Sequence, residues 1–481
     1  MRVKILSLLK VYEEEISLLL WTTVLLFIIR SAGIILNNYA ETTFLKRYGV
    51  EYLPVVNMLN AVATSFIIGG LTVFMGKISG ARLLSYVFIF AGISVTLIRQ
   101  LIPLGLDILY PLLFMLKSQF ELLLTLLFWN MCNDLFNTRQ SKRLFPLLTA
   151  GGLIGLILGS VGTPYFAKTF ALDNLLYIYL ATCLIGFVFV HAMGRSNSTL
   201  ICPNKPHKPG EEKSSMLQQI KDVYPLVKDS ILIKIVLLLT FMPNVVIPIM
   251  NYQFNYAVND QFSSEAAMIQ FFGYFRGGLN TISLFILLFV GRIYGRWGLP
   301  VALMFHPFNY MIAFSAFLFR FDVFSAAYAR MSTTVIRTTI NLPANNILIG
   351  LFPESYRNMI RPFLRGTVVR IALFTGSSLI LISEPFFHPR YLTLVALPFV
   401  LAWMAAPIIL KSKYALILRD LISKNLLDIK SLDTKELRQI FKQDKILSDL
   451  ESSFLAARGK DALWYGKLLK KLYPEKLSPL I

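Results

Sequence analysis

Long apolar runs separated by short polar breaks extend over most of the chain. Each run has about 18 residues or more, enough for a helix to cross a hydrocarbon core, and none alternates strictly as a barrel strand does. The fold predicted is therefore an all-α polytopic membrane protein with twelve spans. They cover residues 16–38, 52–76, 82–102, 106–136, 144–166, 172–193, 230–257, 266–291, 298–319, 322–351, 362–383 and 391–410. The first run lacks a small-residue cleavage site and follows "YEEEIS", which favours a retained span over a signal peptide.

The two halves of the chain repeat each other. "GKISGAR" (76–82) after the second span recurs as "GRIYGRW" (291–297) after the eighth, both read as short loops, and a long polar segment separates the halves. Two six-helix pseudo-repeats joined by a cytoplasmic loop are the plan of the major facilitator superfamily, in which the halves rock about a central site. The predicted units are a bundle at 1–194, a linker at 195–228, a bundle at 229–410 and a cytoplasmic helical tail at 411–481.

Composition and charge agree with a membrane protein. The 481 residues are 56% hydrophobic and only 15% charged, far from the composition of a soluble domain. Basic residues fall mainly on one side if both termini are cytoplasmic, as the positive-inside rule favours. Three cysteines and four histidines are scattered, and no nucleophile, base or phosphate-loop motif is present. We therefore expect no enzyme activity, no metal or cofactor, and no nucleic-acid partner.

Charged side chains nevertheless occur inside the predicted spans, where a lysine or arginine at mid-bilayer costs roughly 2.5–3.5 kcal/mol. Lys117 and Glu121 are four residues apart and can pair along one helical face, and Arg276 and Asn280 form a second i,i+4 pair. The predicted spans 3, 6 and 12, peripheral in the expected fold, hold almost no charge, which indicates a polar cavity inside an apolar shell. The candidate substrate-binding residues are Arg30, Lys117, Glu121, Arg276, Asn280, Arg330, Arg337, Asn341, Asn345 and Arg365.

The tenth span contains the most polar stretch, "YARMSTTVIRTTINLPANN" (328–346). Its cations and amides recur every seven and four residues and therefore share one helical face. They are Arg330, Arg337, Asn341 and Asn345. Basic residues within the spans outnumber acidic ones. Glu121 and Asp134 are the candidate counterions for these basic residues. Unbalanced positive charge predicts an anionic cargo, and the guanidinium fork suits phosphate or carboxylate.

Three segments resemble the ATP/ADP translocase (nucleotide transporter) family of intracellular bacteria and plastids. They are "LLFWNMCNDLFNTRQSKRLFPLLTAGGLIGLILGS" (126–160), "FFGYFRGGLNTISLFILLFVGRIYGRWG" (271–298) and the stretch that starts "NLPANNILIGLFPESYRNMIRPFLRGT" (341–367). The resemblance is to a divergent bacterial branch with a C-terminal helical extension. It implies a multi-pass protein of the bacterial inner membrane that moves its substrate by alternating access, as an antiporter or other secondary transporter.

Two departures bear on the cargo. Where ATP/ADP exchangers have a first helix of the form "LRDTKD", this chain reads "IIRSAGIILNN" (28–38), and "P-T-K-E" in helix 10 is replaced by "PANN" (343–346). At the second of these two positions, "PANN", neutral amides stand where the exchangers have charged side chains. We therefore expect a nucleotide or another phosphorylated or carboxylated metabolite as the cargo, and strict ATP/ADP exchange is not implied.

Two other functions stay open. The basic tail has helix signals, with Asp433 placed as an N-cap and an amphipathic pattern at 461–474, and it is a candidate site for a protein partner. A transporter fold without transport activity could then serve as a membrane scaffold or regulatory subunit. Alternatively, arginines beside phenylalanine-rich walls suit the head group of a lipid or lipid-linked anion, which the protein would translocate.

Overall fold

The described part of the protein is helical throughout. A computed structural model describes residues 11–75, 78–136, 138–196, 216–352 and 354–423, together with Leu455 and Gly466. The features predicted for the tail at Asp433 and at 461–474 lie outside these residues, as does the stretch 197–215 of the predicted linker.

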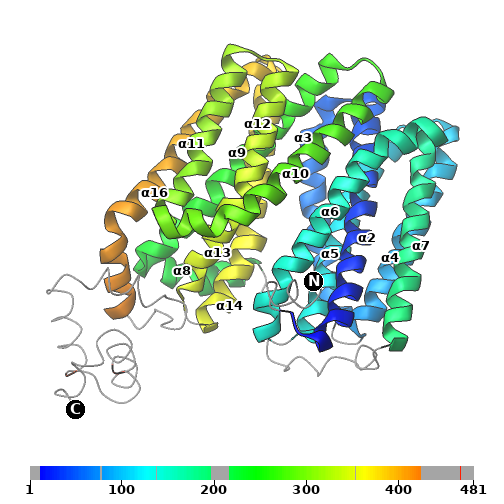
Figure 1. The fold of residues 1–481 in the computed structure, drawn as a ribbon. Coiled ribbons are helices and arrows are strands. Elements are labelled where there is room, and N and C mark those ends of the chain that lie inside the picture. The colour runs from blue at the N-terminus through cyan, green and yellow to red at the C-terminus, as the bar shows by residue number, and fades with distance from the viewer. Residues whose placement is uncertain are drawn as a thin grey trace.

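Two groups of long helices lie side by side (Figure 1). The first group comprises α2 (Glu13–Thr43), α3 (Leu53–Met75), α4 (Gly80–Leu101), α5 (Leu109–Leu135), α6 (Thr138–Phe170) and α7 (Leu175–Ser196). The second comprises α9 (Ile231–Gln261), α10 (Glu265–Trp297), α11 (Leu299–Phe319), α12 (Val323–Ile336), α13 (Leu342–Gly350), α14 (Glu354–Pro362), α15 (Val369–Ser383) and α16 (Leu392–Ser423). We call the end that holds the connection 44–52 the distal end, because α2 begins at the opposite, proximal end.

Ten of the described helical stretches are long and apolar enough to cross a membrane. They correspond to ten of the predicted spans. The predicted spans 266–291 and 322–351, which are α10 and the α12 to α13 segment, are not among the ten. The α12 to α13 segment contains two arginines and several small polar residues, which lower its mean hydropathy. In α10, the side chains of 288 and 290–297 lie outside the described residues.

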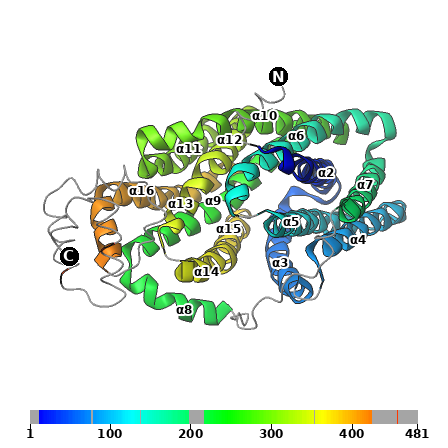
Figure 2. The same cartoon turned by 60° about the horizontal axis from the view of Figure 1, so that its bottom comes forward.

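Several boundaries differ from the sequence prediction. The second glycine-basic repeat, "GRIYGRW", is not a loop, because α10 stays helical to Trp297 and the turn into α11 occurs at Gly298, whose φ of 76° suits a glycine. A short helix, α8 (Met216–Asp229), occupies part of the predicted linker and lies beside α14 (Figure 2). Helix α16 continues past residue 410 to Ser423.

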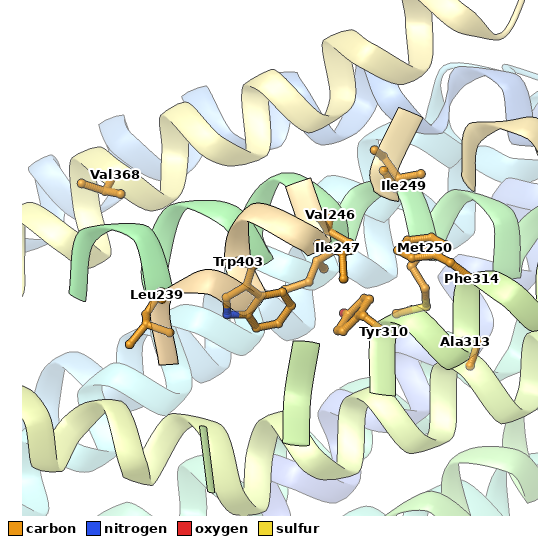
Figure 3. Packing of buried hydrophobic residues seen from close by; sticks show 14 of the residues in the cluster. Leu239, Val246, Ile247, Ile249, Met250, Tyr310, Ala313, Phe314, Val368 and Trp403 are labelled. Atoms are coloured by element: carbon orange, nitrogen blue, oxygen red, sulfur yellow. The ribbon is translucent and has the colours of Figure 1, made fainter. Parts of the chain in front are cut away.

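Buried apolar side chains form two clusters, one in each group of helices. The first cluster draws on α2, α4, α5 and α7, with Tyr39 and Phe88 fully buried. The second is centred on α9, α11 and α16, where the rings of Tyr310 and Trp403 are 5.5 Å apart and lie close to Val246 (Figure 3). Each cluster thus comes mainly from one group, although the second also includes side chains of α3 and α5.

Helix α6 packs closely against a helix of each group. A Cβ at Gly155 would lie 2.6 Å from the carbonyl oxygen of Phe27 in α2, and one at Gly273 in α10 would lie 2.8 Å from the carbonyl oxygen of Ser160. Only glycine allows such close approach of two backbones. This α6–α10 contact is one of two extensive contacts between the groups, and the other joins α3 to α15.

Among the described residues, three π-helical segments extend or connect the α-helices. They are η1 (Phe44–Tyr48) after α2, η6 (Arg337–Asn341) between α12 and α13, and η7 (Phe363–Val368) between α14 and α15. Single π-turns within helices are frequently found at functional sites. Each of the three carries at least one basic side chain, including Arg337 and Arg365 of the predicted binding set.

Candidate functional site

The carboxylate of Glu41 lies at the centre of a buried charge cluster between the two groups of helices. Arg276 of α10 contacts this carboxylate directly, and Lys117 Nζ of α5 is 3.6 Å from it. The lysine also donates to Asn37 Oδ1 at 2.7 Å, and Arg276 donates to Asn38 Oδ1 at 2.5 Å. We call Asn37, Asn38, Glu41, Lys117 and Arg276 the Glu41 cluster. It joins α2 and α5 of the first group to α10 of the second.

Two of the sequence expectations about this cluster are wrong. Lys117 pairs with Glu41 rather than with Glu121, and Glu121 Oε1 instead accepts a hydrogen bond from Arg30 at 3.1 Å. Spacing along one helix made a Lys117–Glu121 pair possible, but a carboxylate on a neighbouring helix competed for the lysine. Glu41, not Asp134, is the main internal counterion; Asp134 lies at the proximal end of α5.

Glu41 was not among the predicted binding residues, and the first span was predicted to end at residue 38. Helix α2 continues to Thr43 and places Glu41 in its last turns, where its side chain is 9% exposed. A usable signal was present, since Arg30, Asn37 and Glu41 recur at intervals of seven and four and share one face of the helix.

Arg330 and Arg337 of the tenth predicted span have no carboxylate as an ion-pair partner among the described residues. Within the described ranges neither forms an ion pair, and both side chains are partly buried. The Arg330 guanidinium lies 5.7 Å from the centroid of the Phe254 ring and acts electrostatically on Glu41 and on Arg337. These two arginines therefore extend the positive charge of the Glu41 cluster along α12 and η6.

The remaining predicted residues occupy varied positions. Asn280 does not bond the Arg276 side chain as expected, since its Nδ2 donates to the backbone carbonyl of Arg276 at 2.8 Å. The side-chain oxygens of Asn341 and Asn345 are buried and accept no hydrogen bond from the described residues. Arg365 is exposed and donates to Asn346 Oδ1 at 3.0 Å, so η7 and α13 meet through this pair.

The charges of the site do not balance. Among the described residues, the candidate cations Arg30, Lys117, Arg276, Arg330 and Arg337 outnumber the carboxylates of Glu41 and Glu121, and Arg337 interacts electrostatically with Arg330 rather than with a carboxylate. Like charges held together in a medium of low dielectric repel one another, so an excess of this kind favours binding of an anion.

A second set of ion pairs, which the sequence analysis missed, joins the groups at the distal end. Arg47 of η1 donates to both carboxylate oxygens of Glu265 at 2.5 and 2.7 Å, and it pairs with Asp173 at 3.0 Å. Lys46 Nζ donates to the backbone carbonyl of Asn259 at 2.8 Å. We call Lys46, Arg47, Asp173, Asn259 and Glu265 the distal network. Sequence alone placed the basic pair in a loop and offered no partner for it.

Solved structures similar to this chain are membrane transporters of the major facilitator type. A structure of the nucleoside transporter NupG aligns with a TM-score of 0.58 and 15% identity, covering 82% of this chain and 99% of that chain. A peptide transporter POT in complex with sulfate gives a TM-score of 0.59 at 12% identity, with coverages of 83% and 95%. A D-xylose-proton symporter gives 0.56 at 12% identity, with coverages of 82% and 96%. These likenesses concern the fold, which agrees with the predicted superfamily.

Sequence comparison identifies the family. A search of curated proteins found no match to the chain. The family model described as TLC ATP/ADP transporter matches residues 108–352, which include the α5 and α10 residues of the Glu41 cluster and both unpaired arginines of the tenth predicted span. The match covers just over half of the chain. On this evidence the protein belongs to the TLC ATP/ADP transporter family.

Proposed function

We propose that this protein is a secondary transporter for an anionic organic solute, a nucleotide or another phosphorylated or carboxylated metabolite. The observation that carries the proposal is the pair of arginines, Arg330 and Arg337, which have no carboxylate partner in the described ranges and lie beside a cluster whose positive charge is already in excess. A guanidinium binds phosphate or carboxylate through two parallel hydrogen bonds. Membership of a transporter family supports the same activity.

The substrate moves by alternating access between two bundles, residues 1–194 and 229–410. In this scheme α10 and the α12 to α13 segment complete twelve spans, and both termini are cytoplasmic in a bacterial inner membrane. The arginines of α10 and of the α12 to α13 segment face the substrate path, which offsets the cost of placing charge within the bilayer. The distal network joins the bundles at one end, and this supports a state closed to the far side of the membrane.

The cargo need not be ATP or ADP. The tenth span has two neutral amides, Asn345 and Asn346, at the positions where ATP/ADP exchangers share a pair of charged residues. Asn346 accepts from Arg365, and the oxygen of Asn345 has no donor among the described residues. A ligand with hydroxyl or amine donors, as nucleotides and sugar phosphates have, would satisfy that oxygen as well as the arginines.

Uptake into proteoliposomes tests the proposal. Purified protein is reconstituted and offered labelled nucleotides, sugar phosphates and dicarboxylates, with protein-free liposomes as the blank. We expect saturable uptake of at least one of these classes, inhibited by unlabelled solute of the same class. If monodisperse, correctly inserted protein moves none of these anions at a rate above the blank, the assignment of an anionic cargo is wrong.

A further inference from the structure

We propose that Glu41 is a built-in counter-anion that allows the unloaded transporter to reorient, so that the protein carries out net transport as well as exchange. The inference rests on the proposed function. Its basis is the position of one carboxylate, supplied by the protein itself, among the cations that an anionic substrate would otherwise have to neutralise.

The geometry of the Glu41 cluster supports this role. Glu41 belongs to α2, whereas Arg276 belongs to α10 in the other group, so their contact crosses the interface that has to rearrange in alternating access. Lys117 approaches the same carboxylate from α5. The side chains of Glu41, Lys117 and Arg276 are 9%, 8% and 11% exposed, and solvent therefore contributes little to neutralising them.

Burial makes the counter-anion necessary. A buried cation whose partner is removed is strongly unfavourable, whereas a buried pair that stays intact is tolerated. When an anionic substrate leaves the site, the empty protein has to keep its most deeply buried cations paired before it can close. With Glu41 in place, Arg276 and Lys117 remain paired in the empty protein.

Arg330 and Arg337 differ from the cluster because their side chains are only partly buried and have no carboxylate in the described ranges. They are available to the substrate, while Glu41 holds the more deeply buried pair of cations. Electrostatic interaction between Arg330 and Glu41 couples the two sets of charges. An anion bound at Arg330 would repel the Glu41 carboxylate, and this repulsion favours release of the contact between the groups.

Efflux from preloaded proteoliposomes separates net transport from exchange. The liposomes contain a labelled anion that the wild-type protein carries, and efflux is measured into buffer with and without the same unlabelled anion. Potassium and valinomycin clamp the membrane potential so that charge movement does not limit the rate. For the wild-type protein we expect net efflux within about threefold of exchange, because its two most deeply buried cations, Lys117 and Arg276, remain paired in the empty protein.

The variant Glu41→Gln removes the charge with little change of shape. We expect the ratio of net efflux to exchange to fall by about tenfold or more, since the return of the empty protein now buries unpaired cations whereas a bound anion pairs them during exchange. Glu41→Asp, which keeps the carboxylate, should retain net efflux better than Glu41→Gln. The double variant Glu41→Gln with Lys117→Met removes one cation together with the carboxylate, and it should recover part of the net efflux. Asp107→Asn, in an exposed loop, is the charge-matched control.

Each outcome decides the inference. If wild-type exchange exceeds net efflux by about a hundredfold, or if Glu41→Gln retains the wild-type ratio of exchange to net efflux, Glu41 is not the counter-anion. The wild-type ratio needs no variant, so the inference can be refuted even if Glu41→Gln fails to fold. Absence of both fluxes in wild-type protein would instead refute the proposed function.

Discussion

The two sets of ion pairs that join the helical groups differ in charge balance. In the distal network Arg47 meets two carboxylates, Asp173 and Glu265, and Lys46 is satisfied by a backbone carbonyl. Around Glu41 the cations outnumber the carboxylates, and Arg330 has none within the described ranges. Balanced pairs suit a contact that holds two bodies together. Excess cations suit a contact that is completed by an anion from outside.

The largest effect is expected at the unpaired arginines. Arg337→Ala should lower anion uptake by about a hundredfold, because a charge-assisted hydrogen bond to a ligand contributes roughly 1.5–3 kcal/mol and its removal leaves the anion underpaired. Folding should be little affected, since Arg337 makes no ion pair in the described part of the protein. Uptake in proteoliposomes at equal protein density measures the effect.

Arg320→Ala is the matched control for this variant, because the Arg320 side chain is 75% exposed and forms only a surface pair with Asp322. Arg390, in the short 3-10 helix Pro389–Tyr391, is less suitable because it donates to the carbonyls of Leu318 and Phe319 at the end of α11. Equal uptake by Arg337→Ala and Arg320→Ala would remove Arg337 from the site.

Truncation of a paired cation should affect stability more than that of an unpaired one. Arg276→Ala leaves Glu41 buried with Lys117 as its main partner, and we expect a loss of about 3–5 kcal/mol in the free energy of unfolding. Arg330→Ala, which breaks no ion pair, should lose much less. Denaturant titrations of both variants in detergent measure the difference. Equal losses would contradict the distinction between paired and unpaired arginines.

The glycines of α10 provide a smaller effect that is independent of charge. Gly273→Ala should destabilise the protein by about 1–3 kcal/mol, because its Cβ would lie 2.5 Å from Pro164 and 2.8 Å from the Ser160 carbonyl oxygen in α6. Gly278→Ala is the control, since nothing lies within 4 Å of the added Cβ, and alanine favours the helix. Thermal unfolding of the two variants in the same detergent should rank them in this order.

The smallest effect is expected within the distal network. A double-mutant cycle of Arg47→Ala and Glu265→Gln should give a coupling energy of about 1 kcal/mol, because both side chains are about one quarter exposed and water screens the pair. Denaturant titrations of the two single variants and the double variant give this value. A coupling energy larger than that between Arg276 and Glu41 would contradict our view that the distal pair is the weaker of the two contacts between the helical groups.

Much of the helix plan could be predicted from the sequence. Apolar runs located most of the long helices, although α16 continues from the predicted end at residue 410 to Ser423. That Arg330, Arg337 and Asn341 share one helical face stays a prediction, since 337–341 is π-helical and does not keep the α-helical spacing. Helix ends were harder to predict, since the first span was predicted to end at residue 38, whereas α2 includes Glu41. Hydropathy falls near the end of that run, whereas tertiary contacts in the structure keep α2 helical to Thr43.

Pairing partners could not be predicted. Lys117 had a carboxylate one turn away on its own helix, but its partner comes from α2, and the partner of Arg47 comes from α10, far along the chain. The π-helical segments carry no local sequence signature that distinguishes them from an ordinary helix. Sequence thus indicated which side chains need partners, and only the packing of the helices determined which partners they have.

An experimental structure determined with a transported anion tests the central claim most directly. Our account predicts density for the phosphate or carboxylate group between the two helical groups, within hydrogen-bond distance of the Arg330 and Arg337 guanidiniums. Density for the ligand elsewhere, with both arginines free of it and Arg276 still bound to Glu41, would contradict the account.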